Sequence, residues 1–126
     1  MEEKDREIWV GENRIYLGED NILCLTILGE VDEETEIGIN EACYTLMSMV
    51  EGKMHALIDL NKAGKSSPGA RKRQKEISEN EKTGKVALFG LHPVARVVAS
   101  FVMGISKNRD MRFFKTEEEA LAWLKK

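Results

Sequence analysis

The segment MHALIDLNKAGKSSPGARKRQKEIS, residues 54–78, decides the fold. Its first seven residues, 54–60, are mostly apolar and predict a buried β-strand. Ser67 and Pro68 have the residue types of a helix N-cap and a first helical position, and residues 68 to about 82 have helical propensity. Because VALF at 86–89 predicts another strand, this strand, helix and strand imply a right-handed parallel unit.

Three further strand-like segments precede this unit. Residues 7–10 and 14–17 predict two short edge strands or one bent strand. Residues 22–28, ILCLTIL, are almost entirely apolar and predict a buried strand that ends at Gly29.

Helices are predicted between and after the strands. Asp32 has the character of an N-cap, followed by acidic residues in the first helical turn, and Gly52 closes this helix. Pro93 opens a helix that is apolar on nearly every side, residues 111–114 predict a last strand, and Thr116 caps a final helix. The apolar face of the first helix, which we expect to be buried, consists of Ile39, Ala42, Cys43, Leu46, Met49 and Val50.

The resulting order, ββαβαβαβα, predicts a single α/β domain over residues 1–126. Its sheet is expected to be mainly parallel and four- to five-stranded, with helices packed against it. The polar N-terminus MEEKDRE has the character of neither a signal nor a transit peptide, so we expect a cytoplasmic protein in which residues 1–6 are disordered. Cys24 and Cys43, in separate apolar segments, are expected to be free and buried thiols.

The formal net charge of −3 conceals two halves of opposite sign. Residues 1–60 carry 15 acidic and 4 basic side chains, whereas residues 61–126 carry 7 acidic and 15 basic ones. Either the basic half binds an anionic partner, or the two halves neutralise each other within the fold.

Five segments together resemble a known family: ALIDL at 56–60, SSPG at 66–69, KVALFG at 85–90, the apolar helix at 94–105, and RFFKTEEEALAWL at 112–124. In this order and spacing they resemble the STAS family of sulfate transporter and anti-sigma-factor antagonist domains. The resemblance is nearest to the little-characterised bacterial and archaeal branch grouped with CRAL-TRIO lipid-transfer domains. It extends from about residue 20 to the C-terminus.

The resemblance implies a regulatory domain that binds another protein, such as a kinase or a sigma-factor regulator. Regulatory members of the family accept phosphate on a Ser or Thr in an Asp-Ser-Ser/Thr-x-Gly-like turn after the third strand. Ser66 and Ser67 fall on that turn and are the phosphoacceptor candidates; Gly69 matches the glycine, and Lys65 replaces the acidic residue. A serine that caps a helix can also accept phosphate, so the structural and functional interpretations of Ser67 are compatible.

Two surfaces suggest partners. The segment 61–75 contains no acidic residue, and it is either a solvated helix face or a surface for an acidic protein or anionic lipid headgroups. Nucleic acid is not expected, because few aromatic residues are interleaved with the basic ones. The basic residues assigned to partner or ligand binding are Lys62, Lys65, Arg71, Arg73 and Arg96.

The apolar helix at 94–105 leaves a further alternative open. It is either core or a surface that docks a second copy or a partner, or it opens to admit an acyl chain. In the last case the chain is a carrier of a lipid or other amphipathic ligand, and Lys62, Lys65 or Arg96 meets an anionic headgroup.

Polar residues follow two predicted parallel strands at the sheet edge where ligands of open α/β folds bind. Asp59 and Asn61 end one strand, and His92 follows another, so all three are assigned to binding. Asp59 and His92 either form an acid–base pair, or bond nearby backbone N–H groups and cap a helix. We expect no enzyme and no cofactor, and two distant histidines without clustered cysteines predict no metal site.

Overall fold

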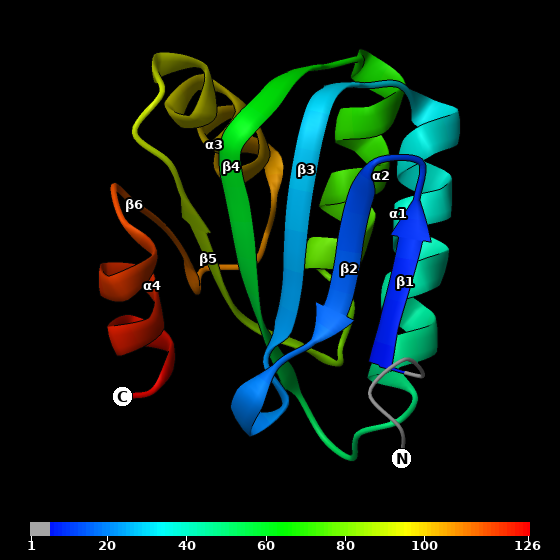
Figure 1. Cartoon of the computed structure of the whole chain (residues 1–126), viewed down its shortest axis with the longest axis vertical. Coiled ribbons are helices and arrows are strands. Elements are labelled where there is room, and N and C mark those ends of the chain that lie inside the picture. Colours follow the sequence, from blue (N-terminus) through cyan, green and yellow to red (C-terminus); the bar gives the residue numbers. More distant parts are fainter. Residues whose placement is uncertain (1–5) are drawn as a thin grey trace.

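The computed structural model describes residues 6–126 (Figure 1). Three strands, and not the two of the predicted order, precede the first α-helix, and from there the strands and helices alternate as predicted. The strands are β1 (Glu7–Val10), β2 (Asn13–Leu17), β3 (Leu23–Val31), β4 (Met54–Ser66), β5 (Thr83–Phe89) and β6 (Met111–Phe114). The helices are η2 (Glu19–Asn21, a 3-10 turn), α1 (Glu33–Met47), α2 (Pro68–Ser78), α3 (Pro93–Ile105) and α4 (Glu117–Leu124). Of the segment expected to be disordered, residues 1–5 lie outside the described residues, and Arg6 donates hydrogen bonds to the carbonyls of Leu17 and Gly18.

The predicted α/β fold class is confirmed, but the sheet has six strands, in sequence order, and not the four to five expected. The count is higher because residues 7–17 form two separate strands that both join the sheet. β1, β2 and β3 pair antiparallel, whereas β3, β4, β5 and β6 pair parallel through helical crossovers. The N-terminal segment is a hairpin and not one bent strand. Gly11, at φ +61°, supplies the backbone conformation that its two-residue turn requires.

Helices cover the two faces of the sheet unequally. α1, α2 and α3 pack on one face over the main core, which holds the fully buried side chains of Ile15, Ile39 and Leu46. α4 packs on the opposite face (Figure 1), where Leu124 and Leu57 belong to a second buried apolar cluster. Apolar side chains are therefore buried on both faces of the parallel strands, which explains why these strands are continuous hydrophobic runs.

The predicted helix caps are present. Asp32 accepts a hydrogen bond from the backbone N–H of Thr35 at 2.8 Å, which satisfies one of the free donors at the start of α1. His92 caps α3, because its Nδ1 accepts from Val94 N at 3.1 Å. Thr116 caps α4 by accepting from Glu119 N at 3.2 Å.

Both central strands are longer than predicted. β3 does not end at Gly29 but passes through it at φ +69° and continues to Val31, with a register shift beside β4. β4 continues from Leu60 to Ser66, because its last residues pair with this extension of β3. The candidate phosphoacceptor turn is consequently the junction of a strand and a helix.

Two helices are shorter than predicted. α1 ends at Met47 and not at Gly52, and the Lys82 ammonium donates to the carbonyls of Met47 (2.8 Å) and Val50 (2.9 Å) beyond that end. These bonds satisfy acceptors that the helix leaves free, so the chain turns early and Met49, expected in the core, is exposed. α2 ends at Ser78, short of Lys82.

Cys24 and Cys43 are free and buried, as expected. Within residues 6–126 we find no helix with the length and apolar character needed to span a bilayer. The same residues bring together no group of three His, Cys, Asp or Glu side chains suited to a metal ion.

Candidate functional site

The candidate site is the junction between β4 and α2, where two consecutive serines meet the start of a helix. The backbone N–H of Ser67 bonds to Val31 O at 3.0 Å, which ties the junction to the end of β3. Ser67 Oγ accepts from Ala70 N at 3.1 Å, so Ser67 is the N-cap of α2. Gly69 keeps the junction close to α1, because a Cβ at this position would lie 2.8 Å from a carboxylate oxygen of Glu33.

The two serines make different contacts. Ser66 Oγ accepts from Gln74 Nε2 at 3.1 Å, and Ser66 lines a cavity beneath α2. Ser67 does not line this cavity, and its hydroxyl contacts the first turn of the helix. The hydroxyl of Ser66 is therefore directed to the interior, and that of Ser67 to the helix N-terminus.

Arg71 connects the junction to α3. Its Nη1 donates to the carbonyl of Ser66 at 2.8 Å, and its guanidinium carbon lies 4.6 Å from the centroid of the Phe101 ring. A guanidinium over an aromatic face at this distance makes a cation–π contact. The side chain of Arg71 thus contacts both the serine pair and the exposed side of α3.

α3 is both core and surface. Its inner side, with Ala95, Val98, Ala99 and Val102, is buried against the sheet. Its outer side carries the exposed apolar side chains of Val97 (52% exposed), Phe101 (49%) and Ile105 (44%), and Leu91 (72%) is exposed in the loop before the helix. We call these four residues the α3 patch. Val97, Phe101 and Ile105 are spaced four residues apart and so share one face of the helix, and exposed apolar side chains gathered in this way are typical of a contact surface.

The basic segment is partly neutralised by acidic residues of the fold. Arg73 forms ion pairs with Glu33 at 3.1 Å and Glu76 at 3.4 Å, and Lys75 pairs with Glu79 at 3.0 Å. Lys62, Lys65 and Lys72 are exposed and form no ion pair among residues 6–126. The two halves therefore neutralise each other in part, because Arg73 of α2 pairs with Glu33 of α1. The exposed lysines leave the binding of an anionic partner as a prediction.

The polar residues predicted at the sheet edge are brought together, but they bond locally. Asp59 Oδ1 accepts from the backbone N–H and the side chain of Asn61, at 2.9 and 3.0 Å. Asn61 Oδ1 in turn accepts from Leu91 N at 3.0 Å, which joins β4 to the loop before α3. His92 caps its own helix, and no hydrogen bond within residues 6–126 links it to Asp59, so the acid–base pair is not assembled. Arg96 is exposed on α3.

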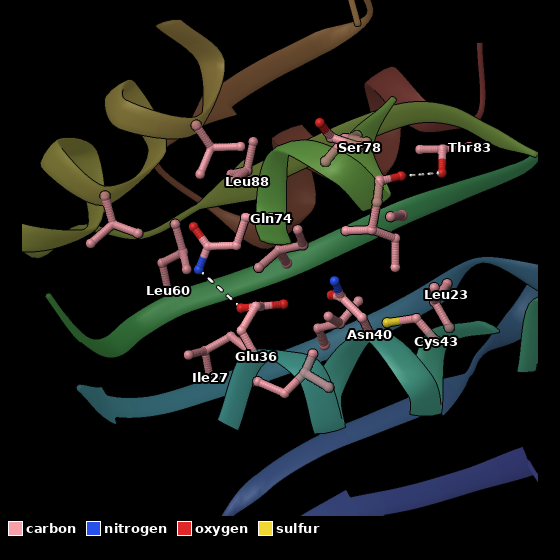
Figure 2. A pocket seen from close by; sticks show the side chains of 18 of the residues that line it. Leu23, Ile27, Glu36, Asn40, Cys43, Leu60, Gln74, Ser78, Thr83 and Leu88 are labelled. Atoms are coloured by element: carbon pink, nitrogen blue, oxygen red, sulfur yellow. Dashed lines mark hydrogen bonds between the residues drawn. The ribbon is translucent and has the colours of Figure 1, made fainter. Parts of the chain in front are cut away.

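A buried polar cluster lies beneath α2, and the sequence interpretation missed it. Glu36, only 5% exposed, accepts from Gln74 Nε2 at 3.0 Å, and Asn40, 6% exposed, donates to the carbonyl of Arg73 (Figure 2). Burial raises the pKa of Glu36 to about 7, although the hydrogen bond from Gln74 opposes the rise. The sequence held a signal: Glu36 precedes Ile39, Asn40 and Cys43 by three, four and seven positions, and so lies on the buried stripe of α1.

Comparison with known proteins identifies the family. Residues 16–126 match the family described as "Domain of unknown function (DUF7793)", and the chain belongs to it. No curated protein sequence matches the chain.

Three solved structures share the fold at low sequence identity. An uncharacterized protein of the DUF3478 family with a SpoIIAA-like fold, from Shewanella loihica PV-4, is 18% identical at a TM-score of 0.66, over 87% of this chain and 90% of that one. The anti-sigma factor antagonist SpoIIAA in its unphosphorylated form is 16% identical at a TM-score of 0.67, over 90% of this chain and 96% of that one. The Bacillus cell fate determinant SpoIIAA in the phosphorylated form is 16% identical at a TM-score of 0.54, over 89% of this chain and 98% of that one. These matches show a STAS-like fold; they do not support the grouping with CRAL-TRIO domains.

Proposed function

We propose that this member of the DUF7793 family is a cytoplasmic regulatory domain that binds another protein and is switched by phosphorylation at the β4–α2 junction. Under this proposal the chain has no catalytic activity and needs no cofactor. A kinase supplies the phosphate, and the regulated partner binds the α3 patch together with the exposed basic residues of α2.

The observation that carries the proposal is the contact of Arg71 with both the junction and the α3 patch. Its guanidinium donates to the carbonyl of Ser66 and lies over the Phe101 ring. A modification at the serines therefore has a direct physical connection to the surface proposed to bind the partner. The likeness to SpoIIAA, solved in unphosphorylated and phosphorylated forms, supports the same assignment.

Ser67 is the preferred phosphoacceptor. A phosphate on Ser67 gains from the backbone N–H groups at the start of α2 and from the helix dipole. A phosphate on Ser66 would instead be placed next to Gln74 and the buried carboxyl of Glu36, where its charge is unfavourable.

Phosphorylation is expected to alter the partner surface through Arg71. A phosphate adds a charge of about −1.5 to −2 and strong acceptor oxygens, with which a guanidinium pairs better than with a carbonyl or an aromatic ring. Arg71 then leaves Phe101, and the exposed apolar area of the α3 patch increases. Binding changes through local charge and exposure and does not require refolding.

The chemistry of the surface specifies the partner. The α3 patch is apolar, Arg96 of the same helix is an exposed cation, and Lys65 and Lys72 at the β4–α2 junction and on α2 are exposed as well. The complementary protein surface has an apolar centre with acidic residues around it. A lipid carrier is less well supported, because the cavity that the inner side of α3 lines holds about 100 Å³, well below the usual ~300–1,000 Å³ of a small-molecule site.

The switch is tested by mass spectrometry of tagged protein purified from the source organism under several growth conditions. We expect one phosphate on the wild-type chain, its loss in Ser67→Ala, and its retention in Ser66→Ala. The absence of phosphate from both serines under every condition would contradict the switch. Phosphate on Ser66 alone would contradict the preference for Ser67.

Partner binding is tested with the same tagged chains. The expected result is a captured protein that is lost with Phe101→Asp and weakened at least tenfold by Lys72→Glu or by raised salt. Met49→Asp, at an exposed apolar residue outside the patch, is the matched control and should retain the partner. Capture that is indifferent to Phe101→Asp would refute the assigned surface.

A further inference from the structure

The cavity beneath α2 is lined by buried hydrogen-bond acceptors, two of which receive no hydrogen bond within residues 6–126. It holds about 100 Å³ and lies between the sheet and the helices α1, α2 and α3. Most of its wall is apolar, with side chains such as Leu23, Leu60 and Leu88, whereas Glu36, Asn40 and Gln74 enter it from the two helices α1 and α2 (Figure 2).

Two of these acceptors have no partner. Asn40 Oδ1 and Gln74 Oε1 are buried and receive no hydrogen bond within residues 6–126. Their amide groups are held in place from the other side: Asn40 Nδ2 donates to Arg73 O, and Gln74 Nε2 donates to Glu36 and Ser66. Buried acceptors left without donors cost free energy, so the cluster favours a molecule that supplies N–H or O–H groups.

Glu36 adds a carboxyl group to the two amide oxygens. Gln74 supplies its one hydrogen bond, and no cation within residues 6–126 forms an ion pair with it. Glu36 and Cys43 are the titratable side chains among the lining residues; those from β3, β4, β5, β6, α2 and α3 are uncharged. Burial raises the pKa of the Cys43 thiol far above its usual range, so the thiol stays neutral and Glu36 is the group that can carry charge here.

We propose that this cavity binds a small primary alkylammonium ion. The three N–H groups of the ion donate to Glu36, Asn40 and Gln74, and its alkyl group fills the apolar part of the cavity. A primary ammonium has the same number of donors as the cluster has acceptor groups, and its charge compensates the carboxylate. This inference is independent of the proposed switch.

The volume limits the size of the ligand. An apolar cavity of about 150 Å³ admits benzene, with six heavy atoms, so about 100 Å³ accommodates about four heavy atoms. Propylammonium has that size. Of the three helices that line the cavity, α2 buries the fewest residues, Ala70 and Ser78, so it is the helix that can move aside most readily for a ligand.

The test is a titration of the isotope-labelled full chain with propylammonium chloride, followed by amide NMR shifts in a buffer free of amines. Sodium chloride at equal ionic strength and the neutral isostere 1-propanol are the comparison titrants. We expect saturable shifts confined to residues around the cavity. Binding should be about tenfold tighter at pH 8 than at pH 6, because the ionised fraction of Glu36 rises about tenfold across that interval.

A matched pair of variants isolates the carboxylate. Glu36→Gln is expected to weaken propylammonium binding at least tenfold while leaving the response to 1-propanol unchanged. Glu41→Gln, on the exposed side of the same helix, should bind as the wild type does. If Glu36→Gln fails to fold, the pH dependence of propylammonium binding to the wild type still tests the role of the carboxylate.

Two results would overturn the proposal. The absence of saturable shifts with propylammonium at either pH would mean that the cavity holds water only. Equal responses to propylammonium and 1-propanol, without pH dependence, would mean a non-specific apolar void.

Discussion

The buried carboxyl of Glu36 should make the stability of this protein fall as the pH rises through neutrality. Burial raises its pKa from an ordinary value of 4.5 to about 7 in the folded chain. Below about pH 4.5 the residue is neutral in both folded and unfolded chains, and it has no effect on the pH dependence. Between pH 4.5 and about 7 the unfolded chain is ionised while the folded chain keeps its proton. The free energy of unfolding therefore falls by up to about 1.4 kcal/mol per pH unit.

The magnitude follows from the two pKa values. The full loss is about 3 kcal/mol, and about 2.5 kcal/mol of it falls between pH 5 and pH 8. This is a large part of the stability of a small domain, which is typically ~5–15 kcal/mol. Glu36→Gln keeps the shape and the hydrogen-bonding ability of the side chain and removes its charge. The variant should therefore gain about 2.5 kcal/mol relative to the wild type over that interval.

The assay is urea denaturation of both chains at pH 5, 6, 7 and 8 in amine-free buffers. The difference between the two free energies of unfolding cancels the titration of every other group. Glu41→Gln, exposed on the same helix, is the control and should stay within about 0.5 kcal/mol of the wild type at each pH. A difference between wild type and Glu36→Gln that is constant from pH 5 to pH 8 would refute the reasoning.

Three further substitutions test the fold by the same denaturation assay. Asp32→Ala removes the N-cap of α1 and should cost about 1 kcal/mol; no change would mean that the bond to Thr35 N contributes nothing. Leu46→Ala truncates a fully buried side chain and should cost about 2–5 kcal/mol, and a smaller loss would show that the core collapses into the space. Lys82→Met removes the ammonium from two carbonyls beyond the end of α1 and should cost about 1–3 kcal/mol, with faster amide exchange in the last turn; unchanged exchange would contradict this role.

The starts of the helices could be predicted because capping is local. Asp32, Ser67, His92 and Thr116 each bond a backbone N–H two or three residues ahead. Such a bond needs only a short polar side chain at the right position, which the sequence displays directly. The parallel strands were equally visible, since burial on both faces makes them continuous apolar runs.

The ends of several elements could not be predicted, because they depend on distant residues. β4 reaches Ser66 because β3 continues past Gly29 to pair with it. In a sequence, a glycine after an apolar run usually indicates the end of a strand, whereas Gly29 lies within β3 at positive φ. α1 ends near Met47, where Lys82, 35 residues away in the sequence, bonds its carbonyl.

The candidate site divides in the same way. Ser66, Ser67 and Gly69 were recognisable because a strand, a cap and a helix follow one another along the chain. The cap bond of Ser67 is also local, whereas the place of Ser66 at a cavity walled by α1 and the sheet arises only when α2 packs against them. The contact of Arg71 with Phe101 likewise joins residues of two helices that are separated in sequence.

The sequence by itself determined the α/β class, the order of the elements and the place of the serine pair, because each depends on local pattern and burial. Only the tertiary structure decided which charges remain exposed and which are paired or buried. Arg73 meets Glu33 across the interface of α2 and α1, and Glu36 is enclosed beneath Gln74. The energy of a charge depends on its solvent and its neighbours in space, and neither is a property of sequence position.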